Sequence, residues 1–251
     1  MTKISEKHSE IRKLIKERSP FDERETNRIL NSSFNHTQML VKIVIRNHQF
    51  DKKKVLDIGC AWGDSLLYWR QDSEGIEIQE HMIKFLKSLG KTVYGLDVDN
   101  GFPGLKQENY DAIFAGAVIE HLLSPHLFLV RLHSLLRPGG ILAISYPVVP
   151  PPFFQGLWKM IVGYQGWLAA SHINFFTPRT SKLILERAGF RVIRQYSPAF
   201  YRIPILRKIN KVFLPIGMSC LSVCQRIDGF KYEGEQPLSN PPWASDLKRF
   251  R

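Results

Sequence analysis

The chain of 251 residues is 44% hydrophobic and carries a net charge of +12. This apolar content excludes a disordered chain, and the length allows one large α/β domain or one domain with appendages. The first 18 residues are charged and lack the apolar stretch of a secretory signal. The three cysteines, Cys60, Cys220 and Cys224, are odd in number and match no metal spacing. We therefore expect buried thiols and a cytoplasmic location, with membrane association as an addition.

The positive charge is concentrated at the two ends of the chain. Residues 1–54 hold 13 Lys and Arg against 7 Asp and Glu, and residues 179–251 hold 14 against 5, whereas residues 55–178 hold 8 against 11. Basic flanks around a mildly acidic centre favour an anionic partner, which would be a substrate, a nucleic acid or a membrane surface. A solvated basic surface explains the same distribution equally well.

The elements alternate in type along the chain. Residues 1–36 are polar with weak helical periodicity, and we interpret them as a frayed or docking N-terminal arm. A helix is predicted at 39–45. Strands are then predicted at 54–58, 75–78, 92–96, 112–114 and 141–146, with helices at 64–70, 79–89 and 125–136. This alternation predicts an α/β fold of the Rossmann-like type, with a seven-stranded, mostly parallel sheet and helices on both faces. Residues 137–140 (RPGG) indicate a sharp stop after a helix.

Residues 147–176 differ from the rest of the chain. They open with a proline-rich turn and continue as an aromatic, nearly uncharged segment, in which Lys159 and several glycines argue against a transmembrane helix. We expect a lid over a substrate pocket, with a membrane-touching or partner-binding patch and ordinary core as alternatives. A helix at 177–188 and strands at 190–195 and 218–225 complete a domain over 37–230, and 231–251 is expected to be a loose tail.

The stretch from Val55 to Gly63 (VLDIGCAWG) predicts a strand that enters a glycine-containing turn. Gly59 and Gly63 let a ligand approach the backbone, and the helix predicted after the turn would offer free N–H groups. The dinucleotide spacing G-x-G-x-x-G is not met, since its second and third places hold Ala61 and Asp64. A carboxylate suits a cation better than a pyrophosphate, so the sulfonium and ammonium of S-adenosyl-L-methionine (SAM) fit this turn better.

The second predicted strand ends in Gly75-Ile-Glu-Ile78. A carboxylate at this place can accept hydrogen bonds from both ribose hydroxyls, and Glu77 follows Gly59 by 18 residues, close to the usual separation. Ile78 can pack on an adenine face. An ordinary surface acid is the alternative for Glu77.

Six motifs in order resemble those of class I SAM-dependent methyltransferases. They begin at Asp57 (DIGCAWG), Gly75 (GIE), Leu96 (LD), Tyr110 (YDAIF), Ile119 (IEHL) and Leu136 (LRPGG). The resemblance covers about residues 40–195. It is closest to the branch with ubiquinone-biosynthesis O-methyltransferases and bacterial glycan or lipopolysaccharide methyltransferases, because HINFFTP from His172 and LERAGF from Leu185 are similar to that branch's post-core segment. One departure is Ala61, where the family often has glycine.

The resemblance implies a set of SAM contacts. Ala115 would line the methionine end of SAM, and four residues would flank it: Asp57, Gly59, Cys60 and Gly63. Glu77 and Ile78 would hold ribose and adenine, and Asp97 would lie beside the adenine. The product would be S-adenosyl-L-homocysteine, with the methyl group on an oxygen of a small-molecule, glycan or lipid-linked acceptor.

Two other functions stay open. One is an RNA methyltransferase, which the basic flanks support but which is not favoured, since no aromatic–basic binding motif accompanies them. The other is a SAM-binding regulatory or assembly protein without turnover. Peripheral membrane contact is a further alternative for the segment at 147–176.

His121 and His172 are the candidate catalytic residues. His121 follows the fourth predicted strand, at the edge where ligands bind in such sheets, and His172 lies between the predicted lid and the next helix. Either can take a proton from a substrate hydroxyl, although a lone histidine is more often structural and a nucleophilic acceptor needs no base. Glu120-His121 matches half of the E-x-x-E-H metal motif of small-RNA 2′-O-methyltransferases. Ala117 stands at the first Glu position, so we expect no metal.

Overall fold

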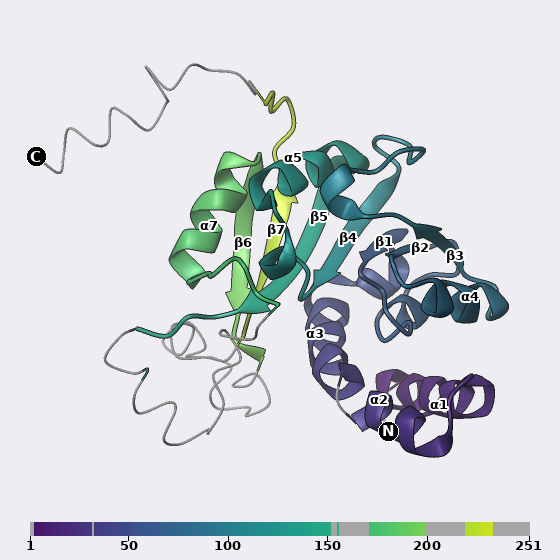
Figure 1. Ribbon diagram of the computed structural model, residues 1–251. Helices are drawn as coiled ribbons and strands as arrows, with labels where there is room; N and C mark the ends of the chain where they lie inside the picture. Colours follow the sequence, from purple (N-terminus) through teal and green to yellow (C-terminus); the bar gives the residue numbers. More distant parts are fainter. Residues whose placement is uncertain (1–2, 32, 152–154, 156–170, 199–218, 233–251) are drawn as a thin grey trace, which may run out of the picture.

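The computed structural model describes residues 3–31, 33–151, 155, 171–198 and 219–232, and shows a single twisted sheet with helices on both faces (Figure 1). The strands are β1 Val55–Ile58, β2 Glu74–Glu77, β3 Thr92–Gly95, β4 Tyr110–Gly116, β5 Leu136–Pro147, β6 Phe190–Tyr196 and β7 Ser219–Arg226. Their order in the sheet is β3-β2-β1-β4-β5-β7-β6. β1 to β5 are mutually parallel, and β7 runs antiparallel between β5 and β6. The predicted seven-stranded, mostly parallel sheet is confirmed.

The longer helices divide between the two faces of the sheet. They are α1 Lys3–Arg18, α2 Glu23–Asn31, α3 Ser33–His48, α4 Glu80–Ser88, α5 Pro125–Leu135 and α7 Pro178–Arg187. Val55 of β1 belongs to the core cluster that contains side chains of α1 to α4, whereas its neighbour Leu56 belongs to the cluster that contains side chains of α5 and α7. Successive side chains of a strand point to opposite faces, so a short apolar strand such as β1 fills both cores.

The N-terminal region is docked on the domain. Ile11 and Ile15 of α1 and Leu30 of α2 are buried in the same core cluster as α3. The phenol of Tyr68 lies 2.6 Å from His8 Nδ1, and its backbone oxygen accepts a hydrogen bond from Lys7 at 2.8 Å. These contacts favour the docking interpretation over the frayed one. The helix α3 also runs through residues 36 and 37, where we predicted the arm to end.

One sequence-based prediction of local structure is wrong. The helix predicted at 64–70 is only a 3-10 turn, Leu66–Tyr68. Every residue from Trp62 to Trp69 is buried, and an α-helix on a sheet buries one face rather than all of them. The stop predicted at residues 137–140 is confirmed, since α5 ends at Leu135, but these residues also form the irregular start of β5, where Gly139 takes a φ of 70° and Leu136 already pairs with Tyr110.

The ends of the predicted lid meet each other. Val148 forms an isolated parallel bridge with Phe176, and Val149 N donates to Phe176 O at 2.9 Å. Most of the segment between them, 152–154 and 156–170, lies outside the described residues, as does most of the predicted tail, 233–251. Within the described ranges, no helix is both long and apolar enough to cross a membrane.

Candidate functional site

The order in which the chain adds strands to the sheet reverses between β1 and β4, and a crevice forms at this point. From β1 the chain moves outward to β2 and β3, and it returns to β4 on the other side of β1. Ligands in such sheets bind beyond the carboxyl ends of the strands at this point. The two segments that follow these strands also touch, since a Cβ built on Gly59 would lie 2.8 Å from Val118 Cγ2. The turn after β1 and the segment after β4 therefore form one site.

The turn after β1 exposes its backbone. Gly59, Ala61 and Gly63 all have positive φ, at 66°, 44° and 83°. The N–H groups of Gly59 and Cys60 both donate to Ile76 O of β2, at 2.9 and 3.0 Å. For Ala61 this left-handed conformation costs about 1–2 kcal/mol, which accounts for the glycine that related chains often carry at this place. The turn thus follows a fixed path that brings backbone, rather than side chains, to the edge of the sheet.

Glu77 ties this turn to the end of β2. Its Oε2 accepts the N–H of Ala61 at 2.9 Å, and its Oε1 accepts the N–H groups of Ile78 and Gln79 at 2.8 and 2.9 Å. The residue is 8% exposed. A carboxylate has about four lone-pair directions, so one acceptor direction is left for a ligand hydroxyl. Glu77 has a structural role in the turn in addition to the predicted contact with ribose.

Asp57 is buried beneath the turn. Its Oδ2 accepts a hydrogen bond from the indole of Trp69 at 2.8 Å, whereas its Oδ1 has no partner among the described residues. The pKa of Asp57 is raised to about 7, chiefly by burial, and the nearby carboxyls of Asp64 and Glu77 contribute to this rise. Hydrogen bonds from Ser65 and Trp69 act in the opposite direction. The sequence offered no signal for Trp69, because twelve residues separate it from Asp57.

The residues present fit the positive charges of SAM. Burial raises the pKa of the Cys60 thiol well above its usual value, and the carboxyls of Asp57, Glu77 and Asp64 add to this effect. Three acidic groups thus surround one glycine turn. A phosphate would meet repulsion here, whereas a sulfonium or ammonium gains from the field. Cys60 itself points away from the edge, since a Cβ on Gly75 would lie 2.7 Å from its sulfur, and it therefore presents only backbone to a ligand.

The remaining predicted cofactor residues lie at the same edge of the sheet. Ile78 is 63% exposed directly after β2, as expected of a residue that can pack on a flat ring. Asp97 follows β3 and accepts hydrogen bonds from Asp99 N and from Asn100 Nδ2 at 3.0 and 3.1 Å. Ala115 is fully buried near the end of β4.

His121 and His172 lie next to each other, although 51 positions separate them in the sequence. Their ring centroids are 4.9 Å apart and the ring planes are inclined at 66° to each other. Glu120, which we had not included among the site residues, is buried beside them, and burial raises its pKa to about 7. One ligand atom from each of the three residues lies within 4.8 Å of the others. The pairing of His172 with Glu120 is a tertiary contact that no local pattern announces.

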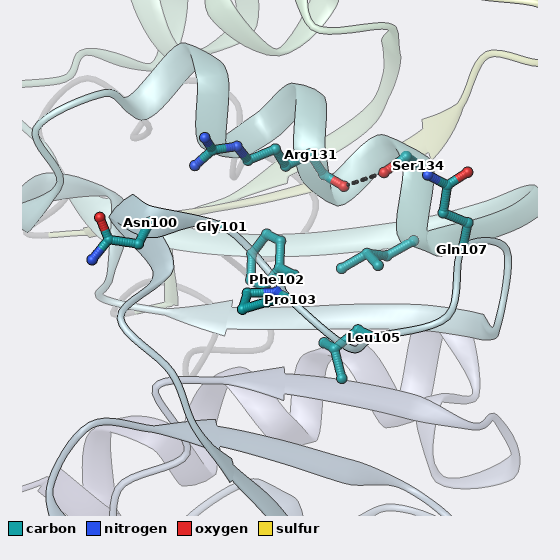
Figure 2. Close-up of a pocket in the computed structure, with 9 residues that line it drawn as sticks. Asn100, Gly101, Phe102, Pro103, Leu105, Gln107, Arg131 and Ser134 are labelled. Carbon is teal, nitrogen blue, oxygen red and sulfur yellow. Dashed lines mark hydrogen bonds between the residues drawn. The ribbon is translucent and has the colours of Figure 1, made fainter.

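A separate hollow of about 330 Å³ lies between α5 and residues 100–107 (Figure 2). Phe102 and Leu105 face it from the loop, and Arg131 and Ser134 border it from α5. It extends toward the amino ends of β4 and β5, away from the edge at which parallel sheets bind ligands. None of the predicted site residues lines it.

The raised pKa of Asp57 predicts a pH-dependent stability difference. An unfolded Asp titrates near 3.9, so the folded state keeps this proton to higher pH and loses stability as pH rises from about 4 to about 7. Asp57→Asn should therefore raise the free energy of unfolding by a few kcal/mol at pH 8 and change it little below pH 4, as measured by denaturant titration. Asp51→Asn, at an exposed carboxyl, serves as the control. If the difference in unfolding free energy between Asp57→Asn and the wild type does not change with pH, the raised pKa of the buried Asp57 is contradicted.

Comparison with known proteins identifies the family. Residues 10–195 match the methyltransferase domain family. The chain is 30% identical over 157 residues to a tRNA U34 carboxymethyltransferase of Pseudoalteromonas translucida, a match that covers 57% of this chain and 46% of that protein. It therefore spans about half the length of the curated tRNA-modifying relatives that it matches.

Solved structures show the same fold. A SAM-dependent methyltransferase from Archaeoglobus fulgidus superposes with a TM-score of 0.55 at 20% identity, over 76% of this chain and 94% of that one. The 1,6-didemethyltoxoflavin-N1-methyltransferase of Burkholderia thailandensis, solved with 1,6-didemethyltoxoflavin and S-adenosylhomocysteine, gives 0.56 at 15% identity, over 91% and 92% of the two chains. The predicted fold, enzyme class and methyl donor are confirmed, whereas the closer likeness to ubiquinone and glycan enzymes stays a prediction. This chain belongs to the methyltransferase domain family and has the fold of the SAM-dependent methyltransferases.

Proposed function

We propose that this chain transfers the methyl group of SAM to an oxygen of a small-molecule, glycan or lipid-linked acceptor. The observation that carries this proposal is the pair of imidazoles formed by His121, on the segment after β4 that packs against the Gly59 turn, and His172, on the return limb of residues 147–176. Two side chains able to act on a hydroxyl thus lie beside the turn that fits the methyl donor.

The proposed donor site uses the residues around the turn. Asp57, Gly59, Cys60 and Gly63 would flank the methionine part, and Ala115 would line it. Glu77 would accept a ribose hydroxyl through its remaining acceptor direction, while Ile78 and Asp97 would border the adenine. When bound, SAM supplies an electrophilic methyl carbon and a thioether leaving group.

The chemistry on the acceptor side needs a proton acceptor. The acceptor oxygen forms a bond to the methyl carbon while the carbon–sulfur bond of SAM breaks. The electron pair of the broken carbon–sulfur bond stays on sulfur, which loses its positive charge. The acceptor hydroxyl loses its proton in the same reaction. We assign His121 and His172 to this end of the reaction, either to accept the proton or to hold the group that lowers its pKa. Alignment of the acceptor with the methyl carbon adds a contribution on the order of 7–11 kcal/mol in favourable cases.

We also propose that residues 147–176 cover the acceptor. Support comes from the described ends of this segment, where the bridge between Val148 and Phe176 brings it back to its starting point, and from His172, which lies on its return limb. An acceptor bound at the histidine pair would therefore lie under this segment. Contact with a membrane surface is the alternative role.

Replacement of residues 153–170 by a short Gly-Ser linker tests the lid. The sheet and the Val148–Phe176 bridge do not include the replaced residues, so the variant should fold and bind SAM as the full chain does. Methyl transfer should fall at least 100-fold, because the acceptor loses one wall of its site. SAM affinity by calorimetry and methyl transfer are measured on the same preparation. Loss of folding would show that the segment belongs to the core, and normal transfer would show that it does not cover the acceptor.

An RNA acceptor is the second candidate. The curated relatives named above act, by their names, on a tRNA uridine, and the basic flanks of this chain suit a polyanion. Against it stands the limited coverage, about half the length of those proteins.

Glu77 tests the donor site. Glu77→Ala should weaken SAM binding by about 1.5–3 kcal/mol in calorimetry, the range for a hydrogen bond to a charged group. Because Glu77 also holds the N–H of Ala61, the melting temperature must be compared in the same experiment. Glu80→Ala, at an exposed acid whose ion-pair partner is Lys84, should keep normal affinity. Unchanged SAM affinity in the Glu77 variant would remove Glu77 from the site, and tight binding of NAD would contradict the donor itself.

The acceptor class is tested by radiolabel from methyl-labelled SAM in a cell extract. We expect label in the glycan, lipid or small-molecule fraction, stable to the conditions that hydrolyse methyl esters. His121→Ala and His172→Ala should bind SAM normally and lower transfer by roughly 10²–10⁴-fold. Label in RNA would favour the second candidate. No label in any fraction would indicate a SAM-binding protein without turnover.

A further inference from the structure

The segment after β4 and the return limb of residues 147–176 are joined by hydrogen bonds. Glu120 O accepts the N–H groups of Ile173 and Asn174 at 2.9 and 3.0 Å. The amide of Asn174 donates to Leu122 O at 2.6 Å, and the ring of His121 meets Ser171 O at 2.9 Å through Nδ1. These bonds fix the backbone on both sides of the cluster formed by Glu120, His121 and His172. The cluster is therefore built into the fold and does not depend on a chance approach of surface side chains.

The carboxylate of Glu120 is the unusual member of this cluster. The residue is 1% exposed, and its Oε2 has no hydrogen-bond partner among the described residues. A buried carboxylate without a partner costs free energy, and proteins normally satisfy it with a donor or a cation. Within the described part of the chain, no Lys or Arg is paired with it. The side chains that lie close to it are the two histidines.

The hydrogen bond of His121 fixes its tautomer. A backbone carbonyl can only accept, so Nδ1 must carry the hydrogen that points to Ser171 O. In the neutral ring this leaves the lone pair on Nε2. Metal-binding histidines commonly donate their other ring N–H to a backbone carbonyl in this way, which fixes the ring and raises its basicity. His121 is thus prepared to act as a ligand through Nε2.

We propose that Glu120, His121 and His172 bind a divalent transition-metal cation. Two imidazoles and one carboxylate are the donor set that suits Zn²⁺, Fe²⁺ or Mn²⁺ rather than Ca²⁺. Ligand atoms around a tetrahedral ion with bonds of about 2.1 Å lie about 3.4 Å apart. One ligand atom of each residue already lies within 4.8 Å of the others, so side-chain rotations can close the site. Three protein ligands leave at least one position for an oxygen of another molecule.

This site replaces the expectation of no metal that the sequence suggested. That expectation came from one local sequence motif, E-x-x-E-H, in which Ala117 occupies the position of the first ligand. The third ligand here comes instead from His172, which the fold brings to Glu120 from the far end of the 147–176 segment. Cation binding itself does not depend on the proposed function; only the role of the cation in methyl transfer rests on it. A coordinated hydroxyl loses its proton at lower pH than a free one, so the cation would orient and activate the acceptor oxygen.

Direct titration tests the site without any measurement of turnover. Untagged full-length protein, freed of metal by a chelator, is titrated with Co²⁺ and the visible absorption of the ion is followed. We expect one equivalent to bind and to be displaced by Zn²⁺. Glu120→Gln and His172→Ala should each weaken binding at least tenfold, since even the loss of a hydrogen-bond partner of a metal ligand costs about 10–100-fold. His81→Ala removes an exposed histidine outside the cluster and should bind as the wild type does.

The outcomes separate this proposal from the proposed function. Failure of the wild type to bind Co²⁺ or Zn²⁺, or equal binding by the Glu120 and His172 variants, would overturn the cation site; SAM binding by the variants verifies that they are folded. Methyl transfer that continues undiminished in chelator would overturn the role of the cation in the reaction while leaving the proposed function in place. Cation binding that needs all three residues, in a chain that transfers no methyl group, would support the site and overturn the proposed function.

Discussion

The carboxylate of Glu77 is the interaction on which the donor side depends. It receives backbone N–H groups from both the turn after β1 and the residues after β2, so one side chain sets the distance between two segments that must contact the same ligand. The bond to Ala61 also holds that residue in its unfavourable left-handed conformation. Beneath it, Asp57 and Trp69 support the same turn from the core side of the sheet. The turn is thus shaped by acids that also favour a cationic ligand.

Much of the fold was predictable because parallel strands are short apolar runs between turn residues. The error came where burial was not periodic. Trp62 to Trp69 are buried without a break, which looks helical in sequence and yet fills a core from several sides. Leu136 to Gly140 follow the end of α5 as their helix-stop residues predict, but they also begin β5, where Gly139 takes its positive φ inside a strand. Propensity describes the local chain, and in both places tertiary packing decided the outcome.

The sequence predicted the residues on the donor side of the candidate site, but only some of those on the acceptor side. Gly59, Gly63 and Glu77 follow the spacing of one βαβ unit, so the sequence alone brings them together. Glu120 and His172 meet only because residues 171–174 return to the segment after β4, and the hydrogen bonds that hold them involve backbone atoms. Backbone partners leave no trace in residue types. The role of Trp69 was not predicted either, because its indole reaches Asp57 through a tertiary contact in the core.

The bridge between Val148 and Phe176 has a consequence for how such a chain can change over time. Because the two ends of the segment are paired at the sheet, lengthening the chain between residue 151 and residue 171 changes the entropy of loop closure by only about 0.6 kcal/mol for each doubling of its length. The sheet and the donor turn do not experience the change. New acceptor walls can therefore be exchanged in one piece, while the residues that bind the methyl donor stay as they are.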